Sequence, residues 1–196
     1  KLTGLLVLAT IPAVIVTLLF NDFIEEAFGG AYLAWGFIVT AIILLATALI
    51  RGRPNPARLE EMGAGQALVV GAAQAVAILP GISRSGATIS TGLMANVERQ
   101  SATRFSFLMS IPAVLGALVF QVKDLLTATP GAEAVTMSGG AMAVGVIAAM
   151  VSGYAALKWM LRLIKGGKLW VFGLYTGLLG ILVLCDQLWF HLVTWG

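Results

Sequence analysis

The stretch Leu79–Ser90, LPGISRSGATIS, decides how this part of the chain folds, because it puts a charge into a long apolar interval. Arg84 is the one charged residue between Met62 and Val97. Two complete bilayer crossings and a turn would need roughly 40 residues or more, which this interval does not supply. The pattern instead predicts a re-entrant hairpin, about 64–97, in which two half-length helices meet at a broken tip. Non-helical backbone at membrane depth is tolerated where protein buries it or where it lines a wet cavity, so the tip is a candidate site.

The composition is that of an integral membrane protein. Of the 196 residues, 59% are hydrophobic and 11% are charged, whereas soluble globular domains average about 25% charged residues. Basic loops at a membrane surface explain the formal net charge of +3, so no nucleic-acid partner is expected. Because Cys185 is the single cysteine, an intrachain disulfide or a paired-cysteine metal site is excluded.

Long uncharged runs predict five membrane-spanning helices beside the hairpin. Each run approaches the about 20 apolar residues that a helix needs to cross a bilayer. The chain is therefore predicted to be an all-α integral membrane protein with a single membrane domain, 1–196. The five predicted spans are about 2–21, 30–50, 104–122, 137–159 and 168–188.

The distribution of lysine and arginine predicts the orientation. Most basic residues fall at one end of the predicted spans, namely at Lys1, Arg51–Arg58, Arg99, Arg104 and Arg162–Lys168. The positive-inside rule places these residues in the cytoplasm. The hairpin then enters and leaves on the cytoplasmic side, the acidic turn Asn21–Gly30 and the loop Lys123–Met137 face outward, and the C-terminus lies outside.

The tip carries the chemistry of an anion site. Pro80 and Gly81 are expected to end the first half-helix, and Ser83 or Ser85 to cap the second. A helix N-terminus offers unpaired N–H groups and a positive dipole end, which favour an anion. Arg84 adds a planar fork of donors suited to phosphate or carboxylate. Alternatively, Arg84 pairs with a carboxylate or with carbonyls and only fixes the hairpin.

Three further polar residues near the tip admit two interpretations each. Thr88 shares a helical face with Ser85 and, like Ser90, either lines the pocket or back-bonds to its own helix. Gln74, in the incoming half-helix, either faces the cavity or bridges two helices. A separate feature is that Ile-Pro-Ala-Val occurs at Ile11–Val14 and again at Ile111–Val114, which we interpret as reuse of a proline-kinked helix.

The segment Gln74–Ser90 resembles the second signature, Pro-Gly-x-Ser-Arg-Ser-x-x-Thr, of the undecaprenyl-diphosphate phosphatases, the bacitracin-resistance family. The match runs from Pro80 to Thr88 without a departure. The resemblance implies a multi-pass enzyme of the bacterial plasma (inner) membrane that hydrolyses undecaprenyl diphosphate to undecaprenyl phosphate and phosphate. This reaction recycles the lipid carrier for cell-wall synthesis. It further implies a bundle of two inverted repeats, each with a re-entrant hairpin.

The candidate site combines what the residues indicate with what the resemblance implies. The predicted partners are a polyprenyl diphosphate lipid, bilayer lipids and, in a homodimer, a second copy. Predicted catalytic residues are Arg84, Ser83 and Ser85, and predicted substrate-binding residues are Pro80, Gly81, Thr88 and Gln74.

A first signature of the family, with two glutamates four apart and a Ser-Ser-Thr-Gly-His stretch, is absent from these 196 residues. The family implies a divalent cation, Mg²⁺ or Ca²⁺, and its ligands are expected in a missing N-terminal part. No metal ligand is predicted within the chain, because Glu25-Glu26 and Glu60-Glu61 lie in predicted loops and His191 lies beyond the last span. We therefore expect an N-terminally truncated member. The alternatives are a lipid or anion transporter or flippase, whose broken helices build similar sites, and an inactive fragment.

Overall fold

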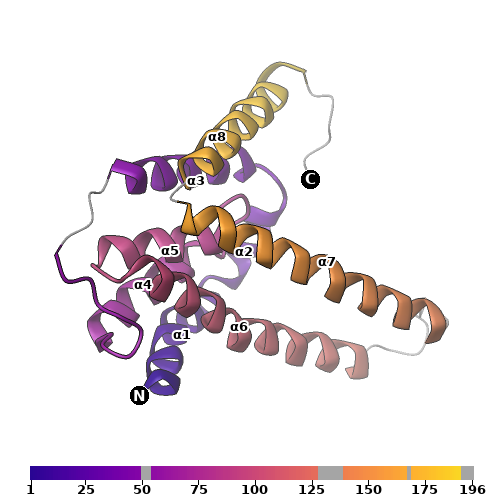
Figure 1. Cartoon of the computed structure of the whole chain (residues 1–196). Helices are drawn as coiled ribbons and strands as arrows, with labels where there is room; N and C mark the ends of the chain where they lie inside the picture. Colours follow the sequence, from indigo (N-terminus) through magenta and orange to yellow (C-terminus); the bar gives the residue numbers. More distant parts are fainter. Residues whose placement is uncertain (50–53, 128–138, 167–168, 191–196) are drawn as a thin grey trace.

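The computed structural model describes residues 1–49, 54–127, 139–166 and 169–190, and the regular elements in these ranges are helices (Figure 1). The prediction of an all-α fold is confirmed. Among the described residues, four helices are long and apolar enough to cross a membrane, over Leu2–Leu19, Arg99–Val119, Gly139–Arg162 and Leu169–Trp189. A fifth candidate span is the pair Asn21–Phe28 and Leu33–Leu49, which is bent by 99°.

The predicted hairpin is present as two short helices, α4 (Ala64–Val76) and α5 (Arg84–Met94), which pack against each other. Their 13 and 11 residues give lengths of only about 20 Å, well short of the about 30 Å hydrocarbon core. The chain between them turns at the Pro-Gly pair. The hairpin therefore returns to the side from which it came.

Residues Asn21–Phe28, predicted as an outward-facing acidic turn, form the helix α2 instead. Ile24 and Ala27 are buried, whereas Asp22, Glu25 and Glu26 are exposed, so the segment is amphipathic. Apolar residues spaced three apart bury one helical face here although three of the eight residues are acidic. The prediction was wrong because the acidic residues were interpreted without this spacing.

Two packed pairs of helices hold the hairpin. On one side, α1 (Leu2–Leu19) packs along α4, where Gly71 lets the backbone of Ala9 approach so closely that a Cβ at Gly71 would overlap it. On the other side, α3 (Leu33–Leu49) packs along α8 (Leu169–Cys185). Glycines of α8 make this contact, since a Cβ at Gly173 or Gly180 would lie about 3 Å from α3 side chains.

The base of the hairpin is closed by a buried cluster and a short clasp. Phe105 and Met109 of α6 (Arg99–Thr127) pack with Met62 and Val70. The clasp is a parallel bridge in which the Ala57 N–H donates to Asn96 O at 2.9 Å and Glu98 N–H donates to Ala57 O at 2.9 Å. The connection from α3 is thereby tied to the end of the hairpin.

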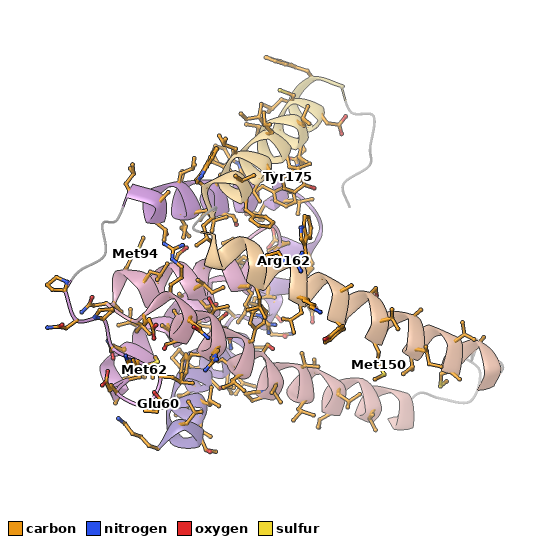
Figure 2. All side chains as sticks on the ribbon, in the orientation of Figure 1. Glu60, Met62, Met94, Met150, Arg162 and Tyr175 are labelled. Carbon is orange, nitrogen blue, oxygen red and sulfur yellow. The ribbon has the colours of Figure 1, made fainter. Side chains whose placement is uncertain are left out.

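One helix, α7 (Gly139–Lys165), extends away from the hairpin beside α6 (Figure 1). None of its candidate span is buried within the described part of the protein. Figure 2 shows Met150 on this projecting part, and 69% of that side chain is exposed. The short π-helical turn Asp186–Phe190 follows α8. His191, the loop 128–138 and the ends of three predicted spans lie outside the described residues.

Candidate functional site

The tip of the hairpin begins where α4 ends and depends on a glycine. Gly81 has φ +83°, a conformation that side-chain-bearing residues rarely adopt. A Cβ at Gly81 would also collide with the carbonyl oxygen of Leu33 in α3. A Cβ at Gly36, one turn further along α3, would collide with the backbone of Pro80 and Gly81. The tip therefore rests directly on the α3 backbone.

Thr40 holds the tip against the α3 backbone through two hydrogen bonds. Its hydroxyl donates to Gly81 O at 3.1 Å and accepts from the Ser83 N–H at 2.9 Å. The side chain is 2% exposed. Two backbone groups of the non-helical loop thus find their partners on α3, as buried backbone polar groups require.

Ser83 caps α5. Its Oγ accepts from the Gly86 N–H at 3.1 Å, so of the two predicted caps the structure has Ser83 rather than Ser85. The α5 helix begins with Arg84, and the Arg84 and Ser85 N–H groups lie in its first turn, where donors lack partners within the helix. The arginine and the positive end of the helix dipole are therefore at one place.

A cavity of about 400 Å³ lies between α1, the end of α4 and α6, and both Arg84 and Gln74 line it. Gln74 is 3% exposed, and neither its amide nitrogen nor its amide oxygen has a hydrogen-bond partner among the described residues. Gln74 therefore lies at the wall of the cavity, while both polar atoms of its amide are buried. A buried amide without partners is costly, which makes it a candidate for binding a polar ligand.

Threonines on α1 add polar atoms to the same cavity. Thr10 and Thr17 line it, and each hydroxyl donates to a carbonyl of its own helix, at 2.8 and 2.9 Å. Their oxygens keep a lone pair that can accept a further hydrogen bond. The two Ile-Pro-Ala-Val segments also meet here, because Ala13 of α1 and Ala113 of α6 both line the cavity.

The remaining predicted site residues hold the tip or flank it. Thr88 is 1% exposed, and its Oγ1 lies 2.8 Å from Arg84 O and 2.6 Å from Ser106 Oγ, so it joins α5 to α6. Ser85 is half-buried next to Arg84. The residues that line the cavity include Arg84 and Gln74 but not the other five. For all seven residues, Arg84 and Gln74 included, contact with substrate stays a prediction.

A second hollow, an apolar groove of about 370 Å³, lies on the other side of α1. It is bounded by α1, α2, α4 and the tip, and all of its lining side chains are apolar. These are Pro12, Val16, Phe20, Phe23, Ile24, Ala72, Ala75, Val76, Ile78 and Leu79. Ile78 lines both this groove and the Arg84 cavity, so the two hollows adjoin at that side chain.

Sequence reasoning missed Thr10, Thr17, Gly36 and Thr40. In the sequence each is a small or hydroxyl residue inside an apolar run, which is ordinary in membrane helices. A hydroxyl within such a run is a weak signal, because it usually back-bonds to its own helix. Thr40 differs in bonding to another segment, and that depends on how α3 meets the tip.

The described residues do not fit a divalent-cation site. Within the described ranges, no group of three or more histidine, cysteine, aspartate or glutamate side chains lies close enough to hold a metal ion. Glu25 and Glu26 are exposed on α2, and Glu60 and Glu61 are exposed at the base of the hairpin, where Figure 2 labels Glu60 beside Met62. Mg²⁺ and Ca²⁺ need several oxygen ligands at one place, and the acidic residues within the described ranges do not provide them.

This fold and site define a polytopic α-helical membrane protein whose re-entrant hairpin presents an arginine, the first residue of its second helix, to a partly open cavity. The chain belongs to the bacitracin resistance protein BacA family, whose model matches residues 1–182. The resemblance found in Pro80–Thr88 is thereby confirmed, and the match extends over most of the chain.

Relatives from several organisms carry the name undecaprenyl-diphosphatase. One from Methanothermobacter thermautotrophicus is 43% identical over 94% of this chain and 99% of its own length. One from Carboxydothermus hydrogenoformans is 41% identical over 95% of this chain and 70% of its own. One from Methanobrevibacter smithii is 38% identical over 93% of this chain, which spans 64% of that relative's length.

Proposed function

We propose that this protein hydrolyses undecaprenyl diphosphate to undecaprenyl phosphate and inorganic phosphate, which recycles the lipid carrier for cell-wall synthesis. The observation that carries the proposal is that Arg84 and Gln74 line one cavity at the tip of the hairpin, where the Gln74 amide has no hydrogen-bond partner among the described residues. Membership of the BacA family and the name of the relatives support the same reaction.

Arg84 binds the diphosphate group of the substrate. A guanidinium offers two parallel N–H donors to phosphate oxygens, and the first-turn N–H groups of α5 add donors beside it. Inside a cavity with mostly apolar walls these charges interact more strongly than in water. Donors held in place before the reaction stabilise charge that develops in the transition state.

Gln74 supplies a second polar contact. Its amide nitrogen donates to a phosphate oxygen, and its amide oxygen accepts from a water or a protonated phosphate oxygen. Binding of the headgroup therefore satisfies both atoms that lack partners among the described residues. This makes Gln74 a substrate-binding residue.

The polyprenyl tail lies in the apolar groove on the other side of α1. Because Ile78 borders both hollows, a headgroup at Arg84 places the first part of its tail beside the groove wall. The wall is formed by the apolar side chains of α1, α2 and α4, which favour a hydrocarbon chain over water.

The proposal includes two alternative nucleophiles for the attack on phosphorus. Either a hydroxyl of Ser83 or Ser85 attacks the terminal phosphorus with loss of its proton, so that the P–O–P bond breaks, undecaprenyl phosphate leaves and water then hydrolyses the phosphoserine, or water attacks the terminal phosphorus directly with the same leaving group. A divalent cation, Mg²⁺ or Ca²⁺, is also proposed, with ligands other than the described residues. Its test is the loss of phosphate release after EDTA treatment and recovery on adding either ion.

The setting of the enzyme is proposed from the charge pattern. The protein crosses a membrane several times and contacts bilayer lipids. We assign it to the bacterial inner membrane with the base of the hairpin in the cytoplasm and the C-terminus outside, following the basic loops. A homodimer is also proposed, through the exposed apolar face of α7. Cysteine labelling from each side of the membrane and light scattering in detergent test these points.

The experiment is an assay of phosphate release from undecaprenyl diphosphate by the purified protein in detergent, with Arg84→Ala and Arg104→Ala compared. Arg104 is an exposed arginine on α6 that does not line the cavity, so it is the matched control. We expect release by the wild-type protein and by Arg104→Ala, and a loss of about 10²–10³-fold for Arg84→Ala. Lipid translocation by vesicles that contain the protein, without phosphate release, would contradict hydrolysis and indicate a flippase.

A further inference from the structure

The tip around Arg84 contributes few strong hydrogen bonds of its own. Within it, the Leu79 N–H donates to Val76 O at 3.3 Å and the Ile82 N–H donates to Leu79 O at 3.3 Å. These are long contacts for N–H···O bonds. The two shorter bonds that hold the loop before Arg84 go to the Thr40 hydroxyl.

We propose that Thr40 is the positioning residue for Arg84. Thr40 acts through Ser83, the residue before Arg84 in the chain. The Thr40 hydroxyl accepts a hydrogen bond from the Ser83 N–H. Ser83 in turn caps α5 with its side chain, while its carbonyl accepts the Ala87 N–H at 2.8 Å. Thr40 thus fixes the residue from which the Arg84 helix starts.

Thr40 itself is held from the opposite side. The α8 helix packs along α3, with Gly177 facing Ala41 next to Thr40 and Gly180 against Phe37 and Ile38. These contacts leave α3 little freedom to move away from the tip. The packing of α8 therefore holds the Thr40 hydroxyl in place, and the position of this hydroxyl determines where the loop before Arg84 lies.

A hydroxyl suits this place because one oxygen both donates and accepts. Valine has almost the same shape but neither capacity, so Thr40→Val leaves Gly81 O and the Ser83 N–H without their partner. Serine keeps the hydroxyl and loses only the methyl group. The pair of substitutions separates the hydrogen bonds from the packing.

The matched control is Thr47 on the same helix. Like Thr40 it is 2% exposed, but its hydroxyl donates to Ile43 O within α3. Thr47→Val removes a buried hydroxyl without touching the tip. A general loss of helix stability would affect Thr40→Val and Thr47→Val alike.

The first test measures hydrogen–deuterium exchange at the tip in the full chain, which does not depend on catalysis. We expect faster exchange of the tip amides in Thr40→Val, and wild-type exchange in Thr40→Ser and Thr47→Val. Equal exchange in all four proteins would overturn the proposal. So would equally faster exchange in Thr47→Val.

The second test measures kcat/KM for phosphate release, and this kinetic part rests on the proposed hydrolysis. Small misplacements of a binding group cost up to about 100-fold, so we expect a fall of about 10- to 100-fold for Thr40→Val and recovery with Thr40→Ser. In an Arg84→Ala background the same Thr40→Val change should cost less than about threefold, because residues that act as a unit are not additive. Full additivity, or wild-type kinetics with a loosened tip, would overturn the positioning role.

The two hypotheses fail in different ways. If the wild-type protein releases no phosphate, the proposed hydrolysis fails, and the Thr40 proposal is then decided by exchange and by the affinity for undecaprenyl diphosphate. Weaker binding by Thr40→Val but not by Thr47→Val would support it. Equal binding by both variants would overturn it.

Discussion

The two hollows on either side of α1 differ in the chemistry of their walls. The cavity has Arg84, Gln74 and two threonine hydroxyls on its wall, whereas the groove is lined by apolar side chains throughout. Both have a volume near 400 Å³, so size does not distinguish them. The difference shows that α1 separates a hollow suited to a charged headgroup from a hollow suited to a hydrocarbon chain.

Among the lining residues other than Arg84, Gln74 is expected to contribute most to headgroup binding. Gln74→Glu places a negative charge beside the bound phosphates, and we expect kcat/KM to fall by about 100-fold or more. Gln74→Leu removes hydrogen bonds to a charged group and should cost about 10- to 100-fold. Phosphate-release kinetics measure both effects.

The same Gln74→Leu protein is expected to gain thermal stability. The leucine replaces an amide that has no partner among the described residues, which removes the cost of a buried unpaired polar group. Loss of activity with a raised Tm would separate binding from folding. A lowered Tm would show that the amide has a structural partner.

Filling the apolar groove should impair long substrates selectively. Ala72 is exposed and lines the groove, so Ala72→Phe reduces its volume without changing the buried core. We expect the KM for undecaprenyl diphosphate to rise about 4- to 15-fold, which corresponds to the loss of one or two buried methylene groups. The KM for a short-chain prenyl diphosphate should change little.

Ala48→Phe is the control for this prediction, because Ala48 is also an exposed alanine on a span but lines neither hollow. A similar rise in KM for Ala48→Phe would mean that a bulky aromatic side chain anywhere on the surface disturbs the enzyme. A rise for short and long substrates alike would place the tail elsewhere.

Removing the partition between the hollows should have the smallest effect. Ile78 borders both, and it is half-buried, so Ile78→Ala loses part of the about 2–5 kcal/mol typical of a buried isoleucine. We expect a Tm decrease of a few degrees and a change of about two- to fivefold in the ratio of KM values for long and short substrates. An unchanged ratio would indicate that the tail does not pass Ile78.

The hairpin could be predicted from the sequence because its signals are local. Pro80-Gly81 breaks the helix, the serine cap starts the next one, and the isolated charge of Arg84 marks the tip. The short interval between Met62 and Val97 then leaves no room for two crossings. These features depend on neighbouring residues and not on packing with other helices.

The contact between the tip and α3, and the two hollows beside α1, could not be predicted in this way. Thr40 lies in an apolar helix and resembles Thr47 in sequence, yet only the packing of α3 against the hairpin gives the two residues different partners. Gly36 looks like an ordinary small residue until Pro80 and Gly81 lie on it. Which faces of α1 line a cavity or a groove is likewise decided by α4, α2 and α6.

The most direct measurement of the division between headgroup and tail is photo-crosslinking with an undecaprenyl diphosphate analogue that carries a photoreactive group in its first isoprene units. After irradiation in vesicles, the labelled peptides are identified by mass spectrometry. We expect label on groove residues such as Phe20, Phe23 and Val76, and loss of this label in Arg84→Ala but not in Arg104→Ala. Label confined to the exposed faces of α7 and α8, or groove label that is the same in Arg84→Ala, would contradict a headgroup held at Arg84 with its tail in the groove.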